Sequence, residues 1–182
     1  MNYIQTEIEG VFIIEPKVFK DSRGYFMEAW KQEEFNEHVG KTNFIQDNES
    51  KSSFGVLRGL HYQKGSLSQA KLVRVIKGRV LDVAVDIRKS SPTFGKHVKI
   101  ELSEDNKRQL FIPRGFAHGF LVLSEEAIFT YKVDNPYAPQ AEAGIRWDDP
   151  ALAIEWPIDF SQVLTSDKDL KHPLMTDAEL FD

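Results

Sequence analysis

Residues 81–87 read Leu-Asp-Val-Ala-Val-Asp-Ile, with a branched apolar side chain at every second position. A two-residue period is typical of a strand with one face toward a core and the other toward solvent, so we expect a half-buried β-strand here. The same period returns at residues 98–102 and 129–133. Lys77-Gly78 separates the apolar residues 72–76 from this first strand, which predicts a tight hairpin between the two segments.

Outward from this stretch, strand patterns recur about every ten residues from position 44 to position 133. This spacing predicts an all-β fold, an antiparallel sandwich or barrel, in a single domain covering residues 1–182. The best helical pattern is residues 30–39, followed by Gly40 as a C-cap. Residues 151–182 contain prolines, and we expect them to wrap over the core rather than add central strands.

Composition narrows the classes of function. The chain has 182 residues, a net charge of −5 and no cysteine, which excludes disulfides, thiol catalysis and Cys-ligated zinc. The acidic balance argues against a nucleic-acid partner, which usually requires a basic surface. The first ten residues do not resemble a signal peptide, and no apolar run approaches the ~20 residues of a membrane helix. We therefore expect a cytoplasmic protein with no membrane partner.

Five histidines are the first candidates for chemistry. His38, His97 and His172 lie in polar surroundings, and we expect them at the surface. His61 and His118 lie in aromatic, glycine-containing strand patterns. Taken alone, these two fit either buried core histidines with satisfied hydrogen bonds or functional groups.

The surroundings of these two histidines resemble the paired motifs of the cupin superfamily, whose fold is a jelly-roll β-sandwich or barrel with a few short peripheral helices. Pro113-x-Gly115-x-x-His118 matches the second motif. In the first motif, Gln63 and Lys71 stand where metal-binding cupins carry a histidine and a glutamate. Gln63 is a poor ligand and a protonated Lys71 cannot bind a cation, so we expect no metal at this position.

The sequence as a whole resembles the dTDP-4-dehydrorhamnose 3,5-epimerase family. The segments that carry this resemblance run through nearly the whole chain: residues 16–19, 21–24, 44–48, 57–63, 82–88, 91–95, 113–120 and 166–169. The resemblance implies an isomerase that needs no cofactor and inverts C3 and C5 of dTDP-4-dehydro-6-deoxy-D-glucose, on the route to dTDP-rhamnose. Both carbons flank the 4-keto group, which acidifies their C–H bonds.

Such a reaction needs a base, a group that stabilises the enolate, and an acid on the opposite face. The resemblance implies that His61 is the base, that Asp169 is its carboxylate partner and that Tyr131 is the acid. It also implies that Lys71 stabilises the enolate oxygen. The remaining substrate contacts that it implies are Arg23, Glu28, Gln46, Asn48, Arg58, His118, Glu142 and Lys168. Family members are homodimers that exchange N-terminal strands, and we expect the same here.

One local prediction follows from spacing. Arg58 and His61 are three residues apart, so a regular strand would point their side chains to opposite faces. For both to reach one pocket, Gly59 must mark a β-bulge, unless Arg58 serves a different part of the site across a subunit boundary.

Three other functions stay open at this point. The chain could be a single-site epimerase that inverts C3 or C5 alone and uses the same base, His61, and the same carboxylate, Asp169. A metal-dependent cupin enzyme would need a bound metal, which Gln63 and Lys71 disfavour. A non-catalytic sugar-nucleotide-binding module would keep Arg23 and Arg58 without needing the base and the acid.

Overall fold

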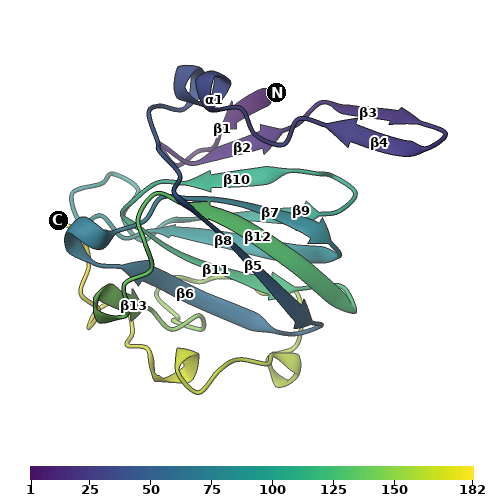
Figure 1. Ribbon diagram of the computed structural model, residues 1–182. Coiled ribbons are helices and arrows are strands. Elements are labelled where there is room, and N and C mark those ends of the chain that lie inside the picture. Colours follow the sequence, from purple (N-terminus) through teal and green to yellow (C-terminus); the bar gives the residue numbers. More distant parts are fainter.

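The computed structural model describes all 182 residues, and antiparallel strands dominate it (Figure 1). One sheet has six strands, in the spatial order β1 (Asn2–Gln5), β2 (Phe12–Glu15), β10 (Gln109–Ile112), β7 (Lys71–Lys77), β12 (Glu126–Val133) and β5 (Gln46–Ser53). A second sheet has five, in the order β13 (Glu142–Gly144), β6 (Leu57–Gln63), β11 (Phe116–Val122), β8 (Arg79–Asp86) and β9 (His97–Ser103). The all-β sandwich predicted from the sequence is confirmed.

The helical content is small, as expected. The α-helix α1 (Gln32–His38) lies within the predicted residues 30–39, and its one buried side chain is Phe35. Four 3₁₀ helices complete the structure: η1 (Gly65–Leu67), η2 (Pro139–Ala141), η3 (Phe160–Gln162) and η4 (Asp169–Lys171).

The core has three parts. The largest cluster contains side chains from both sheets, such as Val73 and Phe129 on one and Ala84 and Phe120 on the other. A second cluster joins the far face of the five-stranded sheet to Trp147 and other residues of the C-terminal segment. A third packs Phe35 of α1 against the six-stranded sheet. The C-terminal segment therefore wraps over the core, as predicted, and lies beneath β6 and β11 in Figure 1.

This wrapping changes the interpretation of the strand at residues 81–87. Val83, Val85 and Ile87 face the C-terminal segment, whereas Ala84 faces the interior between the sheets. The strand β8 is thus buried on both faces along most of its length, so the prediction of a half-buried strand was wrong. The positions that alternate with the branched side chains, Asp82 and Ala84, point inward between the sheets, and Asp82 is fully buried.

The predicted hairpin at Lys77-Gly78 was also wrong. The strands on either side exist, but β7 pairs with β10 and β12, whereas β8 pairs with β11 and β9. Gly78 has a φ of +80° and lets the chain turn from one sheet into the other. A glycine turn between two strands is compatible with either connection, and packing between the sheets decides which one forms.

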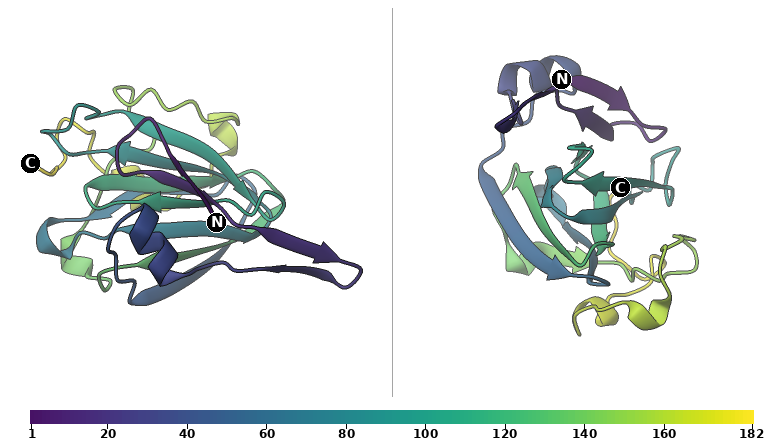
Figure 2. Two further views of the ribbon diagram at one scale, coloured as in Figure 1. Left: turned by 90° about the horizontal axis from the view of Figure 1, so that it is seen from above. Right: turned by 90° about the vertical axis from the view of Figure 1, so that its right-hand side faces the viewer.

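One element stands apart from the sandwich. The strands β3 (Val18–Asp21) and β4 (Gly24–Met27) pair only with each other. We call residues 18–27 the arm, because they project away from the two sheets in Figures 1 and 2. The arm exposes Phe19, Tyr25 and Phe26, with 70% of Phe26 accessible.

Candidate active site

The strand β6 brings His61 and Arg58 to the same cavity through an irregularity at Gly59. His118 of β11 pairs with His61, and Phe120, two residues on, pairs with Arg58, so β6 has one extra residue. Gly59 has a φ of +144°, and a Cβ there would lie 2.6 Å from the Cα of Gly119. The predicted bulge is confirmed, and it needs glycine for both its conformation and the close approach of β11.

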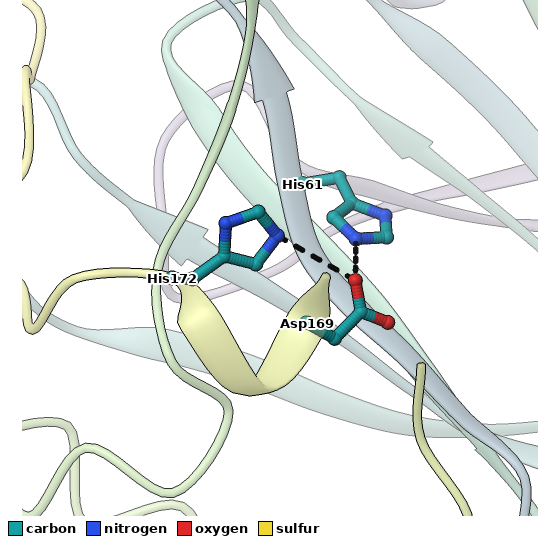
Figure 3. A group of neighbouring side chains, drawn as sticks. All are labelled: His61, Asp169 and His172. Atoms are coloured by element: carbon teal, nitrogen blue, oxygen red, sulfur yellow. Dashed lines mark hydrogen bonds and ion pairs between the residues drawn. The ribbon is translucent and has the colours of Figure 1, made fainter. Parts of the chain in front are cut away.

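The 3₁₀ helix η4 delivers Asp169 to this histidine. The Nε2 of His61 lies 2.6 Å from Oδ1 of Asp169, and 5% of the Asp169 side chain is exposed (Figure 3). The backbone N–H of Asp169 donates to the Ser166 hydroxyl, and Thr165 donates to Oδ2. Burial alone would raise the pKa of Asp169, but the imidazoles of His172 and His61 beside its carboxylate outweigh that effect and hold the pKa well below its usual range.

The pairing fixes the chemistry of His61. Because Asp169 stays ionised, the His61 proton resides on Nε2, and Nδ1 is the ring nitrogen left free to accept a proton. When His61 takes up that proton, the carboxylate stabilises the imidazolium. These two residues, which we call the dyad, therefore form a base of defined tautomer.

A second His–carboxylate pair lies deeper between the sheets. The Nε2 of His118 lies 3.0 Å from both oxygens of Asp82, and 6% of His118 is exposed. Burial lowers the pKa of His118, while Asp82 opposes that shift. Nothing in the sequence pattern had marked Asp82 as a site residue. An aspartate within an apolar strand was the available signal. The alternation predicted that this aspartate faces solvent, because the sequence did not show that the C-terminal segment covers the other face of the strand.

Lys71 lies in the same interior. Its Nζ is 3.5 Å from the backbone oxygen of His61. Burial lowers the pKa of Lys71 to about 8, with Asp82 and Glu142 acting in the opposite direction. The ammonium is therefore charged at neutral pH, although it is largely removed from water.

Tyr131 comes from the opposite wall. It lies on β12 of the six-stranded sheet, whereas His61 lies on β6 of the five-stranded sheet. Burial raises the pKa of the Tyr131 phenol, and the nearby charge of Arg58 acts against that shift. Arg58 donates to the Ser52 hydroxyl across 3.2 Å. The base and the phenol thus come from two different sheets: Tyr131 lines a hollow with Asn48, whereas His61 lines the cavity beside the dyad.

The cavity beside the dyad has a volume of about 340 Å³. Arg58, His61, Glu142, Lys168 and Asp169 line it. Lys168 lies 2.5 Å from Glu142, which also accepts a hydrogen bond from Tyr137 at 2.8 Å.

Two further expected contacts lie on the six-stranded sheet. Gln46 donates to Asn48 across 2.8 Å. Asn48 pairs in register with Tyr131, so their side chains share one face of that sheet.

The structure does not bring Arg23 and Glu28 into this group. Arg23 sits at the turn of the arm, with 88% of its side chain exposed, and pairs with Asp21. Glu28 follows the arm and is exposed. Arg23 lines a separate hollow with other arm residues, away from the cavity of the dyad.

His172 corrects another expectation. It was predicted at the surface, but 10% of its side chain is exposed, and its Nε2 lies 3.5 Å from the same oxygen of Asp169 that His61 contacts (Figure 3). The helical turn of η4 places residues 169 and 172 on one side, which the proline-containing sequence did not reveal. His38 is exposed and His97 is partly buried.

The residues at the cupin metal position do not fit a metal ion. The side-chain amide of Gln63 is committed to the backbone of Leu67, Pro136 and Ala138. Lys71 presents an ammonium, and His118 is held by Asp82.

A jelly-roll sandwich of the cupin type that holds a histidine–carboxylate pair beside a buried ammonium fits the class of the carbohydrate epimerases. The model of the family "dTDP-4-dehydrorhamnose 3,5-epimerase" matches residues 5–177, and the chain belongs to that family. It is 58% identical over 182 residues to the dTDP-4-dehydrorhamnose 3,5-epimerase of Shigella flexneri, covering 100% of this chain and 99% of that protein.

Solved structures agree with this assignment. The Legionella pneumophila dTDP-6-deoxy-D-glucose-3,5-epimerase in complex with dTDP-4-keto-L-rhamnose superposes with a TM-score of 0.93 at 50% identity, covering 97% of this chain and 93% of that one. ChmJ, a 3'-monoepimerase from Streptomyces bikiniensis in complex with dTDP-quinovose, gives 0.89 at 33% identity, covering 95% and 87%. None of the helices in the present structure has the length and apolar character needed to cross a bilayer.

Proposed function

We propose that this enzyme inverts C3 and C5 of dTDP-4-dehydro-6-deoxy-D-glucose and gives dTDP-4-dehydro-L-rhamnose. The dyad is the single observation that carries the proposal. A histidine held in one tautomer by a buried carboxylate is the base that proton removal next to a ketone requires. Family membership supplies the substrate class.

The reaction begins when Nδ1 of His61 removes the proton from C3 or C5. The electron pair moves into the bond toward C4, and negative charge develops on the ketone oxygen. Lys71 supplies a cation for that charge in a site with little water, where the attraction is strong.

Tyr131 then returns a proton to the same carbon from the other face. The raised pKa keeps its phenol protonated at neutral pH. Because His61 and Tyr131 stand on different sheets, the proton leaves toward one wall and arrives from the other. That arrangement produces inversion rather than simple exchange.

Arg58 and Lys168 provide the positive charge for the diphosphate, and guanidinium groups bind phosphate oxygens in a forked geometry. Gln46, Asn48, His118 and Glu142 complete the contacts that we assign to the sugar and nucleoside. The whole chain, residues 1–182, then acts as one epimerase domain.

The direct test is the configuration of the product. Proton NMR of the sugar nucleotide after incubation with the enzyme and EDTA is expected to show inversion at both C3 and C5. Inversion at only one carbon would establish a single-site epimerase, which the likeness to ChmJ keeps as the second candidate. Loss of activity with EDTA would instead indicate a metal-dependent enzyme.

Tyr131→Phe is expected to separate the two proton transfers. Removing the phenol leaves His61 and Lys71 in place, so deuterium exchange from the base face continues, while net inversion falls by about 10²-fold. NMR in D₂O measures both rates in one experiment. Equal loss of exchange and inversion would contradict the assignment of Tyr131 as the acid.

A pH profile tests Lys71. Since its pKa is lowered to about 8, the ammonium loses its charge as the pH rises through that value, and turnover is expected to fall by about tenfold per unit above it. Lys71→Arg keeps its charge throughout this range and should lack this decline, even if its rate is lower. The same decline in wild type and variant would assign it to another group.

We also propose that the enzyme works as a homodimer in which each arm completes the partner's site. The arm carries Arg23 far from its own dyad and exposes Phe19, Tyr25 and Phe26, an apolar surface that a partner would cover. A cytoplasmic location is likewise a proposal, which cell fractionation would test.

Mixed dimers test this arrangement. Arg23→Ala and His61→Ala chains each carry one defect. If Arg23 acts in the partner's site, a heterodimer contains one intact site and one doubly defective site, so activity is expected to return to about half per dimer. If Arg23 serves its own chain, both sites stay defective, and co-expression restores nothing.

A further inference from the structure

His172 is a buried imidazole that the reaction does not use. Its Nε2 is buried, makes no hydrogen bond, and points at the dyad (Figure 3). The ring sits against Gly144, where a Cβ would lie 2.5 Å from Nε2. The absence of a side chain at that position of β13 therefore leaves room for the ring beside the dyad.

Three donor atoms converge here. The Nε2 of His61 lies 2.6 Å from Oδ1 of Asp169, the Nε2 of His172 lies 3.5 Å from it, and all three atoms lie within 4.8 Å of one another. Zinc binds histidine and carboxylate at about 2.0–2.2 Å, which places ligand atoms about 3.3 Å apart in a tetrahedron. The shortest distance must lengthen by about 0.7 Å for a cation to enter, and the two imidazole nitrogens, which lie within 4.8 Å of each other, must come to the same spacing.

We propose that His61, Asp169 and His172 form an inhibitory site for a borderline transition-metal cation such as Zn²⁺. Two imidazoles and one carboxylate are a donor set that zinc prefers, and the cavity offers a fourth position to water. The site shares only His61 with the cupin metal position, because its other two ligands, Asp169 and His172, come from the C-terminal segment rather than from His118 or the positions of Gln63 and Lys71.

The cation would block the base through its tautomer. Zn²⁺ takes the lone pair of His61 Nε2, so the proton on that nitrogen leaves, and a proton from solvent occupies Nδ1. The imidazole stays neutral and no net proton is released. Nδ1 then carries hydrogen and has no lone pair for a substrate proton. Cation binding needs no catalysis, whereas the inhibition rests on the proposed function.

Binding is tested first, with ZnCl₂ as the probe. Equilibrium dialysis of the full-length protein is expected to give one zinc per chain, and His172→Gln is expected to weaken binding by at least tenfold. His38→Gln removes an exposed histidine from α1 and should bind like wild type. Equal binding by wild type and His172→Gln, or no binding by wild type, overturns the proposal.

Cobalt gives a readout that does not depend on any variant. Wild type titrated with Co²⁺ is expected to show the strong visible bands of a four-coordinate ion, and a weak octahedral spectrum would contradict the site. In the exchange assay, Zn²⁺ should inhibit wild type reversibly, and His172→Gln should resist it relative to its own metal-free rate. If the enzyme shows no epimerase activity, the dialysis and cobalt results still decide the cation site.

Discussion

His61→Ala is expected to lower turnover by at least about 10³-fold, because it removes the only base that the dyad provides. Asp169 keeps its contacts with Thr165 and His172, and the residues assigned to substrate binding are unchanged, so binding of the substrate should change far less than kcat. Steady-state kinetics with the 4-keto-6-deoxyglucose nucleotide measure both quantities.

The matched control is His38→Ala, which removes an exposed histidine on α1 that does not line the cavity. Its turnover should stay within about twofold of wild type. Substantial residual activity in His61→Ala would show that another residue removes the proton.

Asp169→Asn is expected to lower turnover by a factor on the order of 10³–10⁴ although its shape is nearly unchanged. The amide nitrogen would donate to His61 Nε2, which forces the ring proton onto Nδ1, the atom that must accept the substrate proton. The amide also cannot stabilise an imidazolium. Turnover measured across a range of pH should stay low, since no pH restores the tautomer.

Thr165→Val is the control for Asp169→Asn. It removes the 3.4 Å hydrogen bond to Oδ2 while leaving the His61 bond to Oδ1 intact. A loss of less than about tenfold is expected. If Asp169→Asn behaves like Thr165→Val, the carboxylate only supports the local fold.

Much of the fold followed from local pattern. The alternating strands, the helix at residues 30–39 and the C-terminal wrap all depend on nearby residues, and the structure has each of them. The bulge at Gly59 followed from a spacing argument, because two side chains of one strand had to share a pocket. The connection at Lys77-Gly78 did not follow, since it depends on which sheets pack together.

The candidate site likewise has residues that could be predicted from the sequence and residues that could not. The resemblance supplied His61, Asp169, Lys71 and Tyr131, and the structure brings His61 to Asp169 across 108 positions of sequence. The resemblance did not supply Asp82 or His172. Both side chains are buried by segments that lie far away in the sequence. Burial created by packing over long sequence distances cannot be seen in the spacing of neighbouring residues.

The net charge of −5 also gains a clearer meaning. It disfavours an extended polyanion, but a small diphosphate needs only a few cations in one place. Arg58 and Lys168 line the cavity beside the dyad, and we assign them to the diphosphate. On this proposal the local position of a few cations, and not the net charge, selects the ligand.

Deuterium exchange tests most directly whether the dyad removes protons from both carbons beside the ketone. The wild-type enzyme is incubated with the 4-keto-6-deoxyglucose nucleotide in D₂O, and NMR or mass spectrometry follows deuterium at each carbon. We expect incorporation at both C3 and C5 by wild type and at neither carbon by His61→Ala. Wild-type enzyme that leaves both carbons free of deuterium would contradict this expectation.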